Sequence, residues 1–382
     1  MEPRKIIVLG ATGSIGSQTL DCVEEANHKE PGSFIVTGLS ANTNLGALLD
    51  SAARFPKAML ALQSTQETHR GIHFMGIEAV SKLVETAEAE LVVNGISGSA
   101  GLMASVHALS SGKNLALANK ESVVMGYSHL KALADKHKLS IIPVDSEHAA
   151  LFQLISRIGA DSISELTITA SGGPFRLKSW QELENIKPDE AARHPVWNMG
   201  RKISIDSATL ANKGLELIEA VRLFGVPESR VKVLIHPESL VHALVRTVDG
   251  ALYAHMSSPD MRLPINIALH WPLEVPTLYG RLDLAGKTLH FDEPDTDRFP
   301  MLDLARRAAR SGEAATIAYN AANEIAVEAF DSGAIRFTAI GSVVAAVLDG
   351  DWTFPVPDLG SIFDIDAKAR SMAHLAVTEF SC

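Results

Sequence analysis

Short apolar runs alternate with stretches of helical periodicity along the first 145 residues. Residues 5–9 are continuously apolar, which is typical of a strand buried in a parallel sheet. Similar short runs occupy 34–39, 58–62, 91–93, 114–118 and 139–144. Helical spacing of apolar positions lies between them at 14–27, 77–86, 102–109 and 121–138. This alternation predicts an α/β fold with a doubly wound, Rossmann-type domain over 1–145.

The pattern changes in the remaining chain. Strands are expected at 164–169, 231–235, 240–245 and 251–256, with the last three antiparallel and Asp249-Gly250 as a hairpin turn. These strands predict a central α+β domain over 146–270. Residues 271–299 are rich in Pro and Asp and indicate a linker. Helical segments at 301–310, 314–330, 338–348 and 364–379 predict a C-terminal helical bundle over 300–382.

The stretch 194–221 contains the most informative helical pattern. We expect a helix from about residue 208, capped by Asp206 or Ser207. Gly214 inside it indicates close approach of another group to the backbone. At 100° per residue a polar stripe lies beside the apolar one, formed by Thr209, Asn212, Lys213 and Glu216. An ordinary solvated face with a Lys213–Glu216 pair would give the same pattern.

Charge and composition exclude several classes of function. The net charge is −11 without a basic block, which argues against nucleic acid and anionic membranes as partners but allows one local phosphate pocket. No apolar run approaches 18 residues, and the N-terminus has the pattern of a strand rather than a signal peptide. The two cysteines, Cys22 and Cys382, have no metal or redox spacing. We therefore expect a cytoplasmic protein without a disulfide framework.

A glycine-rich turn links the first strand to the first helix. Residues 10–16 have the spacing G-x-x-G-x-x-G, and a strand–turn–helix context favours a dinucleotide site over a purely structural turn. The helix N-terminus would then face the pyrophosphate. No acid follows the strand at 34–39, which favours NADP over NAD, although no cation stands there for the 2′-phosphate.

Polar residues follow three predicted strands. Asn119-Lys120-Glu121 comes after one strand, and Asp145 and Glu147 come after the next, where open α/β sheets bind ligands. Two carboxylates at this edge suit a hard divalent cation, although capping of the following helix is an alternative role for them. The loop 170–175 offers backbone N–H groups and a hydroxyl for an anion.

Taken together, these motifs resemble one family over nearly the whole chain. They are Gly-Ala-Thr-Gly-Ser-Ile-Gly at 10–16, Ala-Asn-Lys-Glu-Ser at 118–122, Val-Asp-Ser-Glu-His at 144–148, Ala-Ser-Gly-Gly-Pro-Phe at 170–175, the stretch 194–216, His-Pro-Glu-Ser at 236–239 and Pro-Asp-Met-Arg at 259–262. In this order they are similar to the 1-deoxy-D-xylulose 5-phosphate reductoisomerases, which rearrange and reduce a small phosphorylated sugar with NADPH in isoprenoid precursor synthesis. The resemblance also implies a homodimer.

The resemblance implies a role for each motif residue. Mg²⁺ or Mn²⁺, with Co²⁺ as a further candidate, would bind the catalytic carboxylates Asp145, Glu147 and Glu216. The substrate phosphate would contact Ser171, His194, Ser207, Asn212 and Lys213. The reacting end of the substrate would contact Lys120, Ser146 and Glu147, with Lys120 counted as catalytic. NADPH would contact Thr12, Gly13, Ser14, Ile15, Asn44, Asn119, Glu121 and Gly200.

The segment 194–202 has neither helical nor strand periodicity. It carries Trp197 and Met199, and the resemblance implies a flap that closes over the substrate; a core tryptophan is the alternative. Two rival functions also fit parts of the sequence. Tyr127 and Lys131 fit the Y-x-x-x-K pair of short-chain dehydrogenases, and the nucleotide motif alone would also suit a dinucleotide-sensing regulator without catalysis.

Overall fold

The computed structural model describes residues 2–64, 69–194, 196–197 and 200–381. The chain divides into two compact units, the first formed by Met1–Ser122, Ser128–Ala149 and Asp260–Gly280, and the second by Val123–Tyr127, Ala150–Pro259 and Arg281–Cys382. The expected boundaries at 145 and 270 therefore do not coincide with the limits of these units. None of the helices in the described part of the chain combines the length and apolar character needed to cross a bilayer.

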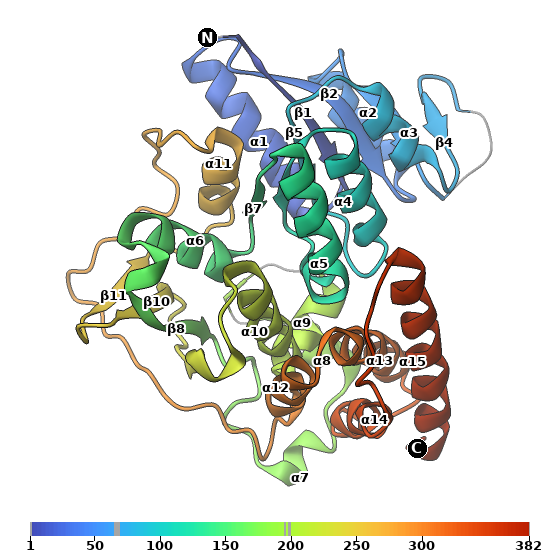
Figure 1. Ribbon diagram of the computed structural model, residues 1–382, viewed down its shortest axis with the longest axis vertical. Coiled ribbons are helices and arrows are strands. Elements are labelled where there is room, and N and C mark those ends of the chain that lie inside the picture. The colour runs from blue at the N-terminus through green and yellow to red at the C-terminus, as the bar shows by residue number, and fades with distance from the viewer. Residues whose placement is uncertain (1, 65–68, 195, 198–199, 382) are drawn as a thin grey trace. The chain divides into compact units, whose positions relative to one another are not determined.

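A seven-stranded parallel sheet forms the centre of the first unit (Figure 1). Its order is β4-β3-β2-β1-β5-β6-β7, so the chain runs outward from β1 in both directions, as predicted for a doubly wound fold. The strands are β1 (Arg4–Leu9), β2 (Phe34–Ala41), β3 (Met59–Leu62), β4 (Phe74–Met75), β5 (Leu91–Asn94), β6 (Asn114–Leu117) and β7 (Ile141–Pro143). The short edge strand β4 was not predicted.

Helices connect the strands of this sheet. They are α1 (Ser14–Lys29), α2 (Leu45–Arg54), α3 (Ala79–Thr86), α4 (Gly101–Ser110) and α5 (Lys120–His137), with α6 (Ser146–Ile158) following β7 and α11 (Arg262–His270) returning to this unit. Helix α2 was not predicted. The first turn of α1 needs glycine where it packs on the preceding loop, because a Cβ on Gly16 would lie 2.2 Å from the carbonyl oxygen of Gly10.

The sheet of the second unit has the order β11-β10-β8-β9. Its strands are β8 (Ile163–Ala170), β9 (Val231–Ile235), β10 (Val241–Thr247) and β11 (Leu252–Met256). Strands β10 and β11 form the predicted antiparallel hairpin. The antiparallel assignment of β9 was wrong, because β9 runs parallel to β8. The helices between β8 and β9 provide the long crossover that a parallel pair requires.

Two helices, rather than one, occupy the stretch after residue 200. Helix α9 covers Arg201–Ala208 and α10 covers Ala211–Phe224, following the short helices α7 (Trp180–Leu183) and α8 (Pro188–Ala191). Leu210 separates α9 from α10 with a left-handed φ of 63°. Asp206 and Ser207 therefore lie in the last turn of α9, and the prediction that either caps the following helix was wrong. Thr209 ends α9 and is not part of the polar stripe on α10.

The C-terminal helices form the predicted bundle in the second unit. They are α12 (Met301–Ser311), α13 (Glu313–Asp331), α14 (Ala339–Leu348) and α15 (Leu359–Glu379). Helix α13 packs against the three others, and most of its residues are buried. Helix α10 joins this core at Gly214, where a Cβ would lie 2.5 Å from the hydroxyl oxygen of Tyr319 and 2.8 Å from Cβ of Ala305. The close approach predicted for this glycine is confirmed.

Substitution of Gly214 by Ala tests this contact. The added methyl group would overlap Tyr319 and Ala305, so we expect the free energy of unfolding in urea to fall by about 1–3 kcal/mol. Gly46 provides a matched helical control, because the nearest atom to its Cβ position is 3.9 Å away. Gly46→Ala should leave stability unchanged or slightly higher. Equal stability of Gly214→Ala and the wild-type protein would contradict this packing.

Candidate active site

The polar edge of α10 is buried rather than solvated. Lys213 and Glu216 are only 4% and 1% exposed, and the Lys213 ammonium forms an ion pair and hydrogen bond with the Glu216 carboxylate. The Asn212 amide donates a second hydrogen bond to the same carboxylate. An ordinary solvated face is therefore excluded, since charged groups at this depth require partners. The arrangement places an ammonium and an amide together near the start of a buried helix.

The loop after β8 packs against the end of α9. Gly172 and Gly173 have left-handed φ values of 81° and 68°. A Cβ on Gly173 would lie 2.8 Å from the carbonyl oxygen of Ser207. Glycine at this position is therefore required for the loop to reach α9. As a result, the half-buried Ser207 lies beside the loop that carries Ser171.

His194 is fixed in one tautomer by its hydrogen bonds. Its Nδ1 accepts from the backbone N–H groups of Val196 at 3.1 Å and Trp197 at 2.9 Å. The proton of the neutral ring must then lie on Nε2, which is 2.9 Å from Ser171 Oγ and donates to it. The Gly173 N–H also donates to this oxygen, at 3.3 Å. The Ser171 hydroxyl thus accepts from two donors and can give its own proton to a bound oxyanion.

Burial, together with the positive charge of Lys213, lowers the pKa of His194 to about 4. His194 is therefore neutral at pH 7, and its role in this structure is to donate from Nε2 rather than to supply a charge. The positive charge that acts on His194 is that of Lys213. The predicted phosphate residues Ser171, His194, Ser207, Asn212 and Lys213 all belong to the second unit.

The predicted residues at the strand ends of the first unit also contact one another. Lys120 begins α5, and its ammonium lies 2.8 Å from Oδ2 of Asp145, which follows the end of β7. The Ser146 hydroxyl donates to the Glu147 carboxylate in the first turn of α6. The backbone carbonyl of Asp145 accepts from Ala149, while its carboxylate pairs with Lys120. The buried His148, to which no role was assigned from the sequence, lies 3.9 Å from this carboxylate.

Residues predicted to contact NADPH occupy helix starts. Thr12 and Gly13 precede α1, which begins with Ser14 and Ile15, and Gly13 makes no side-chain cap. Asn44 accepts from the Ala47 N–H and caps α2. Asn119 caps α5 by accepting from Ser122 and donates to Glu121 at 2.8 Å. Gly200, in the second unit, is exposed and precedes α9.

Only part of the predicted flap belongs to the described residues. Met199 lies outside them. Trp197 is half-buried, and its ring centroid lies 6.3 Å from that of His242. The last two residues of the segment, Arg201 and Lys202, are helical, so the expectation of an aperiodic stretch through residue 202 was wrong.

Three family models match successive parts of the chain. They describe 1-deoxy-D-xylulose 5-phosphate reductoisomerase at residues 6–126, its C-terminal domain at 141–224, and a second DXP reductoisomerase C-terminal domain at 256–372. The reductoisomerase of Treponema denticola is 43% identical over 98% of this chain and 97% of its own length. The chain belongs to the 1-deoxy-D-xylulose 5-phosphate reductoisomerase family. The enzyme of Chlorobium limicola is 41% identical, with 97% of this chain and 99% of its own covered.

Solved structures of the family have the same fold. A DOX-P reductoisomerase in complex with NADPH, fosmidomycin and magnesium is 38% identical, with a TM-score of 0.89 over 98% of both chains. The Zymomonas mobilis reductoisomerase in complex with NADPH is also 38% identical, with a TM-score of 0.89 over 98% of this chain and 99% of its own.

The short-chain dehydrogenase interpretation of Tyr127 and Lys131 was wrong. Lys131 instead pairs with Asp135 one turn further along α5, on a half-exposed surface.

The pKa of His194 generates a pH prediction for this family member. Its folded-state pKa of about 4 lies below the ordinary value of 6.5, so between these values the unfolded chain binds a proton that the folded chain does not. Stability should therefore fall as the pH drops through this window. When the pH is lowered from about 7 to about 4.5, we expect the Tm of His194→Gln to fall less than the Tm of the wild-type protein.

The exposed His374 on α15 serves as the control for this experiment. His374→Gln should retain the wild-type dependence of Tm on pH. If Tm depended on pH in the same way for His194→Gln and the wild-type protein, His194 would not be held in its neutral form.

Proposed function

We propose that this chain converts 1-deoxy-D-xylulose 5-phosphate to 2-C-methyl-D-erythritol 4-phosphate, with NADPH as hydride donor and Mg²⁺ or Mn²⁺ as the metal ion. Full-length similarity to the family supports the reaction. The observation that carries the substrate assignment is the buried Lys213, whose charge acts on His194, the hydrogen-bond partner of Ser171. The substrate phosphate does not react. Its binding energy is therefore available to orient the carbon atoms whose bonds change.

In this proposal the phosphate binds to five residues of the second unit. Lys213 supplies the positive charge, and the hydroxyl of Ser171 donates a hydrogen bond directed by the Nε2–H of His194. Ser207 at the end of α9 and Asn212 at the start of α10 complete the set with a hydroxyl and an amide. Hydrogen bonds to a phosphate dianion are charge-assisted and stronger than those between neutral groups.

We further propose that Asp145, Glu147 and Glu216 provide oxygen ligands for one divalent ion. Carboxylate oxygens fit Mg²⁺ and Mn²⁺, and lysines already offset the charge of two of them, Lys120 for Asp145 and Lys213 for Glu216. When bound, the ion would supply Lewis-acid stabilisation of the substrate's carbonyl and hydroxyl oxygens. Lys120 and Ser146 would hold the reacting end of the substrate through hydrogen bonds.

NADPH would bind along the strand ends of the first unit, with its pyrophosphate at the start of α1. Thr12, Gly13, Ser14 and Ile15 lie there, and the Gly13 N–H already donates to the carbonyl oxygen of Gly10 at 3.0 Å. Asn119 and Glu121 lie at the start of α5. Asn44 and Gly200 complete the proposed contacts. The preference for NADPH over NADH is supported by the absence of an acid after β2, where Asn42 and Thr43 stand. Equal kcat/KM values for the two cofactors would refute it.

Two further properties are part of the proposal. We expect a homodimer, which light scattering of the purified protein would reveal as twice the mass of the chain; a monomer at assay concentration would refute it. We also expect a cytoplasmic location, for which fractionation of the source cells is the test.

The metal proposal predicts the effect of three amide substitutions. Asp145→Asn, Glu147→Gln and Glu216→Gln each remove a charged ligand, so metal-dependent NADPH oxidation with 1-deoxy-D-xylulose 5-phosphate should fall roughly a hundredfold or more. NADPH binding, followed by its fluorescence, should be largely retained. Glu88 is exposed and pairs with Lys5, so Glu88→Gln serves as the control and should keep wild-type activity. Wild-type rates and metal affinity in all three amide variants would rule out the site.

The phosphate proposal predicts a loss specific to the substrate. Lys213→Ala removes a charge-assisted contact that contributes about 1.5–3 kcal/mol, so kcat/KM for the substrate should fall about 10- to 100-fold. Lys232→Ala is the control, since Lys232 is exposed and pairs with Glu165. An unchanged kcat/KM in Lys213→Ala would mean that the phosphate binds elsewhere.

The flap proposal predicts a fluorescence change of Trp197. Closure over a substrate excludes water from the reaction, so we expect the half-buried indole to become fully buried when metal and a phosphonate substrate analogue are added. The measurement requires replacement of the other tryptophans by Phe, namely Trp180, Trp271 and Trp352. The same emission with and without analogue would identify Trp197 as a fixed packing residue.

A further inference from the structure

A buried carboxylate lies one residue before a proposed phosphate contact. Asp206 is 1% exposed and belongs to the last turn of α9, immediately before Ser207. No role follows for it from the sequence beyond helix capping, which the structure excludes. A carboxylate removed from water in this way must be compensated by specific partners.

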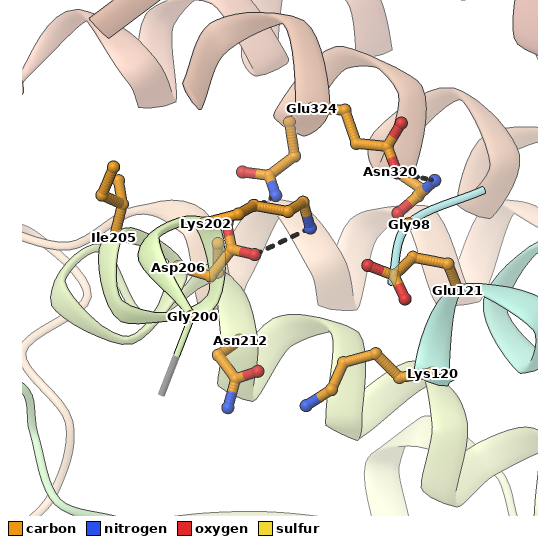
Figure 2. A network of polar contacts seen from close by, with 12 residues as sticks. Gly98, Lys120, Glu121, Gly200, Lys202, Ile205, Asp206, Asn212, Asn320 and Glu324 are labelled. Carbon is orange, nitrogen blue, oxygen red and sulfur yellow. Dashed lines mark hydrogen bonds and ion pairs between the residues drawn. The ribbon is translucent and has the colours of Figure 1, made fainter. Parts of the chain in front are cut away.

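Both oxygens of Asp206 have such partners. Oδ2 accepts from the Lys202 ammonium at 2.9 Å, one turn earlier on α9 (Figure 2). Oδ1 accepts from the Asn323 amide at 2.8 Å, and Asn323 is a fully buried residue of α13. Burial raises the pKa of Tyr319, one turn before Asn323, and the charge of Asp206 adds to this rise. The carboxylate therefore connects α9 to the centre of the helical bundle.

The same bundle helix holds α10. Tyr319 packs against Gly214 and donates to the carbonyl oxygen of Met301 at 3.1 Å. Helix α9 carries Ser207, and α10 carries Asn212 and Lys213, on either side of the left-handed residue Leu210. Two contacts with α13, Asp206–Asn323 for α9 and Tyr319–Gly214 for α10, thus connect both helices that carry these three side chains to the same helix.

We propose that Asp206 is a positioning residue for phosphate recognition. Through Asn323 and Lys202 it holds the end of α9 so that the Ser207 hydroxyl faces the same point as Asn212 and Lys213. Asp206 itself does not touch the substrate. This inference rests on the proposed phosphate site, and it adds that the site depends on a buried charge in the interface between α9 and α13.

The chain contains a matched control in the same pair of helices. Arg201 of α9 pairs with Asp331 of α13 at 2.6 Å, but both side chains are substantially exposed. Exposed ion pairs contribute little to holding helices together. Asp331→Asn therefore removes a bridge between α9 and α13 without changing the buried carboxylate.

The experiment compares Asp206→Asn, Asn323→Leu and Asp331→Asn with the wild-type enzyme. We expect the first two to raise the KM for 1-deoxy-D-xylulose 5-phosphate about tenfold, with a smaller change in kcat, because ground-state binding is lost. Competitive inhibition by inorganic phosphate should weaken in parallel. Asp331→Asn should stay within about twofold of wild type. The exchange Asp206→Asn with Asn323→Asp restores a carboxylate–amide bridge and should recover part of the affinity.

Tm is measured for every variant, and if Asp206→Asn does not fold, Asn323→Leu tests the same bridge from α13. The inference is overturned if these variants retain the wild-type KM while Lys213→Ala raises it. It is also overturned if Asp331→Asn raises the KM as much as Asp206→Asn does. An unchanged KM in Lys213→Ala would instead refute the phosphate site, and the role of Asp206 with it.

Discussion

The buried ion pair of Lys213 and Glu216 is the constraint on which the second unit depends. Both charges lie on one side of α10, away from water, where neither would be tolerated alone. Their positions three residues apart allow them to pair within one turn, and Asn212 adds a hydrogen bond to the carboxylate. The helix can therefore be buried while it carries an ammonium group near its start. Burial and that charge keep His194 neutral, and the backbone N–H groups that donate to its Nδ1 fix the direction of the hydrogen bond to Ser171.

The surrounding elements hold this charged helix in position. Gly214 permits contact with Tyr319, while the carboxylate of Asp206 reaches Asn323 on the same helix, α13. The glycines after β8 bring the Ser171 loop against the end of α9. In the first unit the same principle recurs, since Asp145 at a strand end is compensated by Lys120. Buried charges are thus paired with neighbours in both units, and the pairs lie at the residues proposed to bind substrate and metal.

Local patterns predicted much of this architecture, and their failures have identifiable causes. The parallel sheet follows from short apolar runs, because both faces of its strands are buried. The polar stripe of Asn212, Lys213 and Glu216 follows from helical spacing alone. The burial of this stripe does not follow from the spacing, because it depends on bundle helices that occur about a hundred residues later in the chain.

The errors in the second unit arise where the structure depends on features that the local sequence does not show. Asp206 precedes an apolar run, which is the usual signal of a cap, but its partner Asn323 is 117 positions away and invisible to local analysis. The break at Leu210 requires a left-handed leucine, a conformation that the sequence does not signal. Strand β9 was assigned as antiparallel together with the two hairpin strands, whereas the crossover through α9 and α10 makes it parallel to β8.

A crystal structure of the enzyme with inorganic phosphate or a phosphonate substrate analogue would show directly where the phosphate group binds. We expect an oxyanion within hydrogen-bonding distance of both Lys213 Nζ and Ser171 Oγ, with His194 Nε2 still donating to that hydroxyl. An oxyanion bound elsewhere, with Lys213 still engaged only by Glu216, would contradict it.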